Sequence, residues 1–176
     1  MTTNATTHMT YESPVGPLTV VGGLAGLFGI HFPGQPTPRG APAEPLPLLR
    51  VTAKQLDEYF GGARREFDVA LDLRGSRFQL AVWRELTRIP YGTTIAYKEL
   101  AARVGRPDQV RAVAGAVART PAPIVVPCHR VVAVDGALTG YAGGLERKRA
   151  LLDLEARVAA ALEPQAGRAP QQTVLL

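Results

Sequence analysis

The sequence predicts an α+β protein built from two parts, a small mixed N-terminal domain over residues 1–74 and a helical C-terminal domain over residues 75–162. Up to residue 73, short apolar runs are separated by proline and glycine, a pattern typical of strands and turns. From Ser76 onward, the apolar residues recur at helical spacing instead. The last fourteen residues, 163–176, are expected to form a disordered tail.

The N-terminal domain is expected to combine two strands, a helix and a third strand in chain order. Residues 10–32 favour a strand, a glycine-rich turn and a second strand, and the proline-rich residues 33–46 favour a surface loop. Residues 47–60 favour a helix that ends at the glycine pair 61–62. The residues that share one face of this helix are Leu49, Thr52, Leu56 and Tyr59. Residues 66–73 alternate in polarity, as a third strand would.

The C-terminal domain is expected to hold helices and a loop. The helices cover residues 76–89, 97–105, 110–119 and 145–162, with an N-cap at Ser76, and the loop covers residues 135–144. The second and third helices join through a short turn near Gly105, which is typical of a helix-turn-helix that binds DNA. An ordinary helical hairpin buried in a core gives the same pattern, so both interpretations stay open.

Charge is distributed unevenly along the chain. Residues 74–150 hold 13 Lys or Arg and 5 Asp or Glu, whereas residues 1–73 hold 5 and 7. A basic block suggests a polyanionic partner, nucleic acid first, although an arginine-rich solvated surface would give the same count. The single cysteine excludes an intramolecular disulfide, and no zinc-ligand spacing of Cys and His is present. No signal peptide or bilayer-length apolar run is recognised, so a reduced, cytoplasmic protein without membrane association is expected.

The stretch PIVVPCHRVV surrounds Cys128, the only cysteine of the chain. A lone cysteine is more often a buried core residue than a nucleophile. Three neighbours favour the nucleophile: Pro127 argues against a central strand, His129 can take a thiol proton, and Arg130 adds positive charge near a thiolate. Adjacent residues of a strand point apart, so we expect His129 to reach Cys128 only at a bend or through a water.

A histidine that acts as a base also needs a group to fix its tautomer, usually a carboxylate. Asp153 and Glu155 on the last predicted helix are the candidates, and Glu155 lies four residues from Leu151, partly on the apolar face. A cysteine hydrolase could use Cys128, His129 and Glu155 in this way. It would need an oxyanion motif that the sequence does not show, and it would leave the helix-turn-helix and the basic block unexplained.

Four segments match one known family closely. They read FQLAVWRELTRIPYGTTIAYKELAARVGRP, RAVAGAV, PCHRVV and GYAGGLERKRALLDLE, and they span residues 75–155 almost without gaps. With them, the chain resembles the O6-alkylguanine-DNA alkyltransferases, also called methylated-DNA–protein-cysteine methyltransferases. The resemblance implies a ribonuclease-H-like N-terminal domain and a winged-helix-like C-terminal domain. It also implies repair of duplex DNA without a cofactor or metal, by a protein expected to be monomeric.

In this family the alkylated base is flipped out of the duplex and its alkyl group passes irreversibly to a cysteine, so one molecule repairs one lesion. The resemblance implies that Cys128 attacks the alkyl carbon, that His129 takes its proton through a water, and that Glu155 orients His129. The residues implied to hold the base, O6-alkylguanine and possibly O4-alkylthymine, are Tyr97, Val131, Tyr141 and Ala142. Those implied to face the DNA minor groove are Arg111, Ala112, Ala114 and Gly115, with Arg111 entering the base stack.

Two residues depart from the family pattern. Thr120 stands where relatives usually have an asparagine that ties the end of the DNA-facing helix to the cysteine segment, and a hydroxyl lacks the separate donor and acceptor of an amide. Ala114 stands where relatives favour glycine, and its methyl group could weaken close approach to DNA. A second hypothesis is therefore a non-catalytic or impaired lesion-binding protein of the same fold. Relatives of that kind lack the cysteine, which makes the alkyltransferase the leading hypothesis.

Overall fold

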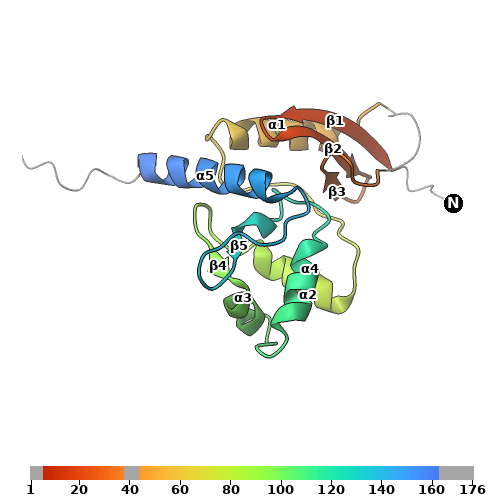
Figure 1. The fold of residues 1–176 in the computed structure, drawn as a ribbon. Coiled ribbons are helices and arrows are strands. Elements are labelled where there is room, and N and C mark those ends of the chain that lie inside the picture. The colour runs from red at the N-terminus through yellow and green to blue at the C-terminus, as the bar shows by residue number, and fades with distance from the viewer. Residues whose placement is uncertain (1–5, 38–43, 163–176) are drawn as a thin grey trace, which may run out of the picture.

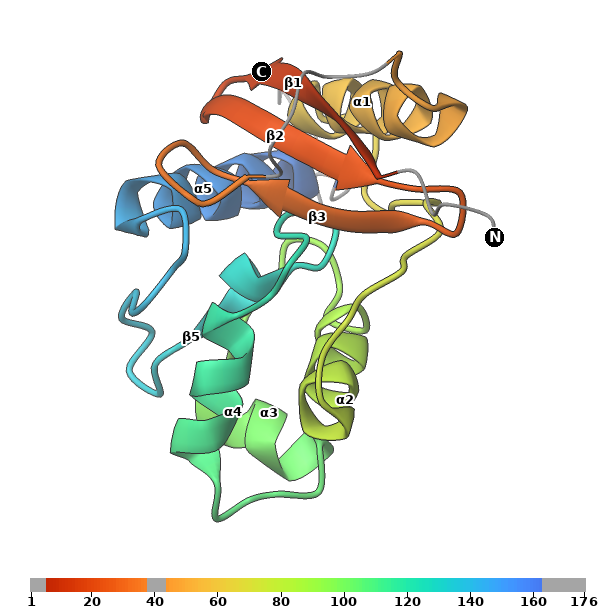
Figure 2. The ribbon, with the colours of Figure 1, turned by 90° about the vertical axis from the view of Figure 1, so that its right-hand side faces the viewer.

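The computed structural model describes residues 6–37 and 44–162, and the predicted tail, residues 163–176, lies outside them. A three-stranded sheet and one helix form the N-terminal part, and most helices gather at the other end of the molecule (Figure 1). The C-terminal helix α5 (Leu145–Leu162) runs between these two groups (Figures 1 and 2). This is the mixed α/β class that the sequence predicts.

The sheet contains one strand more than the sequence predicted for residues 10–32. Strands β1 (Thr7–Ser13), β2 (Gly16–Gly22) and β3 (Leu27–His31) are antiparallel in the order β1-β2-β3. The missed turn contains only Pro14 and Val15, and the Ser13 hydroxyl donates to the Gly16 carbonyl at 2.6 Å to close it. A two-residue hairpin loop of this kind leaves almost no break in the apolar pattern, so the pattern predicts one strand where the structure has two.

Helix α1 (Pro47–Phe60) packs on β1 and β2, as its apolar face predicts. Its buried residues are Leu49, Thr52, Gln55, Leu56 and Tyr59, and the chain leaves the helix at Gly61. The loop predicted over residues 33–46 includes residues 38–43, which lie outside the described ranges.

The strand predicted over residues 66–73 is wrong. This segment has no strand and makes a single bridge, between Leu27 and Leu71. The Gln55 side-chain amide takes the place of a partner strand, because it donates to the Asp68 carbonyl at 3.0 Å and accepts from the Asp68 N–H at 2.8 Å. Alternating polarity marks an extended chain, but it cannot show whether another strand lies beside it.

The C-terminal part follows the predicted helices closely. Helices α2 (Arg77–Leu86), α3 (Tyr97–Arg103) and α4 (Val110–Ala118) pack on one another. Ser76 caps α2 in a reciprocal pair of hydrogen bonds with Gln79, and Gly105 ends the first helix of the helix-turn-helix with φ +75°.

A short parallel ladder between β4 (Ile95–Ala96) and β5 (Val131–Val132) was not predicted, because two residues are too few to show a pattern. The winged-helix description of this part stays a prediction. Throughout residues 6–37 and 44–162, no helix is both long and apolar enough to span a membrane.

Candidate active site

Cys128 begins a single 3₁₀ turn, η1 (Cys128–Arg130), between helix α4 and strand β5. Four residues earlier, Ile124 has φ +77°, an unusual backbone conformation for a β-branched residue that reverses the chain before the turn. The cysteine segment is therefore bent rather than a strand, and Cys128 and His129 lie on this bend. Both side chains are buried, with Cys128 only 4% exposed.

The surroundings of the Cys128 sulfur favour the neutral thiol. Burial raises the pKa of Cys128 to about 11, although the Thr120 hydroxyl, the Lys148 ammonium and the Tyr141 hydroxyl each favour the thiolate. The Tyr141 hydroxyl is buried and has no hydrogen-bond partner among the described residues, so its proton is free for an anion beside it. Charge can form on the sulfur only if a base removes the proton.

The cation beside the sulfur is Lys148, and the expectation that Arg130 fills this role is wrong. Arg130 points to Glu155 and to the Ile89 carbonyl, which its Nη1 meets at 2.6 Å. Lys148 is fully buried, and its Nζ donates to the carbonyls of Val131 at 2.6 Å and Thr139 at 2.9 Å. The sequence did contain a signal, because Lys148, Leu151 and Glu155 follow the spacing of one helix face.

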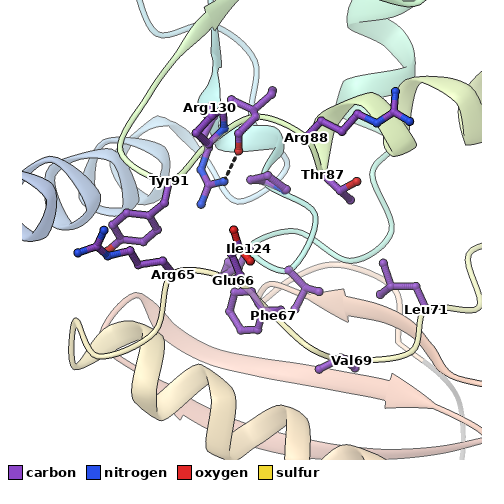
Figure 3. A pocket seen from close by; sticks show the side chains of 14 residues that line it. Arg65, Glu66, Phe67, Val69, Leu71, Thr87, Arg88, Tyr91, Ile124 and Arg130 are labelled. Carbon is purple, nitrogen blue, oxygen red and sulfur yellow. Dashed lines mark hydrogen bonds between the residues drawn. The ribbon is translucent and has the colours of Figure 1, made fainter.

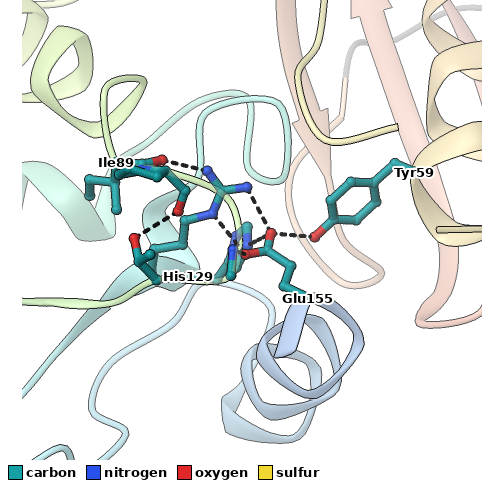
Figure 4. Close-up of polar contacts among 8 residues, drawn as sticks. Tyr59, Ile89, His129 and Glu155 are labelled. Atoms are coloured by element: carbon teal, nitrogen blue, oxygen red, sulfur yellow. Dashed lines mark hydrogen bonds and ion pairs between the residues drawn. The ribbon is translucent and has the colours of Figure 1, made fainter. Parts of the chain in front are cut away.

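Glu155 is the centre of the polar network shown in Figure 4. Its Oε1 accepts hydrogen bonds from His129 Nε2 at 2.7 Å, Arg130 Nη2 at 2.8 Å and the Tyr59 hydroxyl at 2.8 Å. Its Oε2 accepts from Arg130 Nε at 2.9 Å and the Gly92 N–H at 3.1 Å. Burial alone would raise the pKa of Glu155, but the hydrogen bonds from His129 and Arg130 outweigh it and lower the pKa to about 2. The other candidate, Asp153, is exposed.

This contact settles which ring nitrogen of His129 carries the proton. An ionised carboxylate can only accept, so Nε2 must donate to Glu155, and Nδ1 of the neutral ring is left as an acceptor. Nδ1 is buried and has no partner in the described part of the chain. Burial lowers the pKa of His129, which keeps the imidazole neutral. The ring is thus held with a free proton-accepting nitrogen.

A pocket of about 550 Å³ lies between helix α4 and the loop before α5. It is lined by Tyr97, Val110, Arg111, Ala114, Ala118, Thr139 and Gly140. Of the residues predicted to hold a base, Tyr97 lines this pocket and its hydroxyl donates to the Thr139 carbonyl at 3.3 Å. Val131 is buried in β5, whereas Ala142 is exposed on the loop. Tyr141 packs edge-on against Phe32 of the N-terminal part, with ring centroids 5.6 Å apart.

Helix α4 presents small residues on its outer face. Arg111 and Ala112 are exposed, and Ala114 and Gly115 are half-buried. The opposite face of the helix is buried, where the Trp83 indole donates to the Ala116 carbonyl at 2.9 Å. All four residues predicted to face DNA therefore retain access to solvent.

Thr120 lies directly after α4 and is buried. Its hydroxyl donates to the Val117 carbonyl at 2.7 Å and lies beside the Cys128 thiol. The hydroxyl therefore lies between the end of α4 and the cysteine turn, at the position where the family usually has an amide.

A second pocket, of about 590 Å³, opens between the N-terminal and C-terminal parts (Figure 3). Arg65, Phe67 and Val69 line it from one side, and Arg88 and Tyr91 from the other. Cys128, His129 and Glu155 line neither pocket, but the pocket next to α4 contains Tyr97, Arg111 and Ala114 of the predicted site, which makes it the better candidate. Among the described residues, no group of three His, Cys, Asp or Glu side chains could hold a metal ion.

The fold and the site together define a class: a two-part α/β protein whose only cysteine is buried on a turn next to a histidine–glutamate pair. Two sequence models of one family match almost the whole described chain. The model described as "6-O-methylguanine DNA methyltransferase, ribonuclease-like domain" matches residues 7–73, and that described as its "DNA binding domain" matches residues 77–157. The chain belongs to the 6-O-methylguanine DNA methyltransferase family.

Relatives agree in sequence and in structure. A methylated-DNA–protein-cysteine methyltransferase of Mycobacterium tuberculosis is 46% identical over 150 residues, which cover 84% of this chain and 91% of the relative. One from Methanosarcina barkeri is 44% identical over 147 residues, covering 82% and 93%. The crystal structure of M. tuberculosis OGT in complex with DNA matches with a TM-score of 0.80 at 44% identity, and the match covers 86% of this chain and 93% of that chain.

Proposed function

We propose that Cys128 is the acceptor of the alkyl group that this DNA-repair methyltransferase removes from O6-alkylguanine. The observation that supports this most directly is the Glu155–His129 pair, whose histidine lies on the same turn as the only cysteine and whose carboxylate comes from helix α5. The family transfers the group to a cysteine of the protein itself, and Cys128 is the single residue of that type. The protein binds DNA as its substrate.

The proton of the thiol leaves first. His129 Nδ1, the free acceptor, takes it through a water, and Glu155 stabilises the imidazolium that results. Lys148 and the Tyr141 hydroxyl stabilise the thiolate, which otherwise forms poorly in its buried surroundings. The Cys128 thiolate and the His129 imidazolium are thus connected through a hydrogen-bonded water and make no direct contact.

The thiolate then attacks the alkyl carbon in line with the bond to O6. A carbon–sulfur bond forms as the carbon–oxygen bond breaks, and the electron pair of that bond goes to the guanine. Tyr97 donates a proton or hydrogen bond to the guanine ring and so neutralises the leaving base. The thioether has no hydrolytic exit, which makes the reaction a single turnover that needs no cofactor.

The lesion must leave the duplex to reach Cys128. We assign Arg111 to the space that the base vacates in the stack, with Ala112, Ala114 and Gly115 allowing helix α4 to approach the minor groove. The pocket beside Tyr97 receives the base, and we assign Val131, Tyr141 and Ala142 to contacts with the base from the neighbouring strand and loop. Thr120 acts as the hinge between α4 and the cysteine turn. We further assign the protein to the cytoplasm as a monomer without membrane association.

The test is an intact-mass measurement after incubation with duplex DNA carrying one O6-methylguanine. We expect one added methyl group per protein, located on the peptide that contains Cys128, and no second turnover. Cys128→Ala should abolish transfer and retain DNA binding. A parallel duplex with O4-methylthymine tests the wider substrate range, and light scattering tests the monomer.

Each alternative gives a different result in the same experiment. A protein that binds the lesion tightly and gains no mass would be the non-catalytic lesion binder. Continued turnover of a substrate would indicate the cysteine hydrolase and exclude irreversible transfer to Cys128.

A further inference from the structure

The N-terminal part contributes a side chain to the network that holds His129. Tyr59, near the end of helix α1, donates its hydroxyl proton to Glu155 Oε1 at 2.8 Å (Figure 4). This oxygen is the one that His129 Nε2 contacts at 2.7 Å. Tyr59 and Glu155 are 96 residues apart in sequence and come from different parts of the molecule.

Ring packing and one hydrogen bond together fix the position of the Tyr59 side chain. The side chain is fully buried, and its ring packs against Phe60, Phe67 and Tyr91 with centroids 5.3, 5.4 and 6.0 Å away. Burial raises the pKa of Tyr59, so the hydroxyl remains a neutral donor at any working pH. A rigid ring with a single hydrogen bond at its tip is suited to hold the carboxylate in one orientation.

We propose that Tyr59 is a positioning residue for alkyl transfer, which fixes the Glu155 carboxylate against His129 from the N-terminal part of the chain. The proposal rests on the proposed function of Cys128, His129 and Glu155. The ribonuclease-like part of the protein is then a component of the reaction machinery and does more than support it.

The hydroxyl also influences the charge that His129 can bear. Each donor on Glu155 reduces the negative charge available to an imidazolium. The other groups that face this pair are Arg130 from η1, Lys148 from α5, Tyr141 from the loop before α5, and Tyr91 with the Gly92 amide from the loop after α2. Removing the Tyr59 hydroxyl leaves Glu155 a stronger partner for the imidazolium, so the pKa of His129 should rise.

The test compares Tyr59→Phe with Tyr11→Phe in single-turnover methyl transfer. Tyr11 is a matched control, because its hydroxyl donates to Asp57 Oδ1 at 2.7 Å on the same helix but has no contact with Glu155. At saturating DNA we expect Tyr59→Phe to lower the transfer rate constant about tenfold, since it removes one hydrogen bond to a charged group. The dissociation constant for DNA should not change, and the acid limb of the pH–rate profile should move to higher pH.

Two further variants separate positioning from a loss of folding. Tyr59→4-aminophenylalanine restores a donor at the same place and should recover the rate, whereas 4-methylphenylalanine fills the space without a donor and should not. In a Glu155→Gln background, Tyr59→Phe should have no additional effect on the rate. A Tyr59→Phe protein with the rate and pH profile of the Tyr11→Phe control would overturn the proposal, as would equal rates for the two unnatural variants. Absence of transfer in the unmodified protein would instead contradict the proposed function.

Discussion

Five hydrogen bonds converge on the Glu155 carboxylate, and those from His129 and Arg130 lower its pKa to about 2 despite its burial. Only one of the five donors, His129, can change its own charge in the neutral pH range. The remaining four hold the carboxylate in place while the imidazole gains and loses a proton. The arrangement therefore separates the task of positioning from the task of proton transfer.

The free energy of unfolding should fall in two steps as the pH is lowered. Burial lowers the pKa of folded His129 below its usual 6.5, so the unfolded chain takes up a proton first and stability declines below about pH 6.5. The folded pKa of Glu155 is about 2 against an ordinary 4.5, so its contribution, about 3 kcal/mol, is present above pH 4.5 and lost as the pH falls toward 2. Urea unfolding between pH 3 and about pH 8 measures both steps.

Variants assign each of these steps to a residue. Glu155→Gln should remove the lower step, and His129→Gln the upper one. Unfolding free energies that stay constant between pH 7 and pH 5 would contradict the assignment to His129.

Lys148 should lower the energy of the Cys128 thiolate. Lys148→Met keeps the length of the side chain and removes its charge, so the pKa of the thiol should rise further and the transfer rate should fall at neutral pH. Raising the pH should recover part of the loss, because more thiolate then forms without the cation. A rate deficit that is the same at all pH values would show that Lys148 serves only to hold the carbonyls of Val131 and Thr139.

At the scale of the elements, the loop before α5 depends on the N-terminal sheet. Phe32, which follows β3, packs on Tyr141, and a Cβ at Gly143 would come within 2.8 Å of the Phe32 ring. Arg147 adds hydrogen bonds to the carbonyls of Val15 at 2.7 Å and Gly143 at 2.9 Å. The loop that borders the pocket next to α4 is thus held in place both by Phe32 and by Arg147.

Gly143→Ala should displace this loop and slow transfer more than it weakens DNA binding. The reason is steric, since real Cβ atoms essentially never approach another atom as closely as 2.8 Å. Single-turnover kinetics and binding titrations on the same duplex measure the two effects. Phe32→Leu in the same chain should restore part of the rate by making space, and failure of this pair to recover any activity would contradict the steric explanation.

The sequence predicted elements whose determinants are local. Helix α2 begins where Ser76 and Gln79 can cap it, and α3 ends where Gly105 can adopt a positive φ. The prediction of a strand over residues 66–73 is wrong because the pairing of this segment depends on Gln55, which lies far away in sequence. For the same reason, the contacts of Arg130 with Glu155 and of Tyr59 with Glu155 could not be predicted. Motif resemblance named Cys128, His129 and Glu155 as the candidate reacting residues, whereas the position of Lys148 beside the thiol depends on packing.

At the scale of the whole molecule, the basic part of the sequence coincides with the helical end of the structure. Most basic residues belong to residues 74–150, and the helix-turn-helix lies at the end of the molecule away from the sheet and α1 (Figure 1). We propose that the boundary between the two domains lies between Arg74 and Gly75, where the chain passes from the sheet to α2. Helix α5 contacts both the N-terminal and the C-terminal domain, so the structure of each domain depends on the other.

DNA binding should weaken as salt rises, because basic side chains that contact phosphates release counterions. Arg106→Ala, in the exposed turn between α3 and α4, should reduce the slope of log affinity against log salt by about 0.9, the value of one phosphate contact. Arg50→Ala, on α1 at the opposite end, should leave the slope unchanged. Fluorescence anisotropy over a salt series measures both, and equal slopes for the two variants would place the DNA elsewhere.

Helix α5 limits which changes in length the chain can accept. Lys148 and Glu155 are seven residues apart on one face, which is about two turns and roughly 10.5 Å along the axis. One residue inserted between them would rotate Glu155 by about 100° relative to Lys148. The chain could keep its cation beside the sulfur or its carboxylate beside the imidazole, but not both. Substitutions on the exposed face of α5, such as those at Arg149 or Asp153, leave the spacing of Lys148 and Glu155 unchanged and are not restricted in this way.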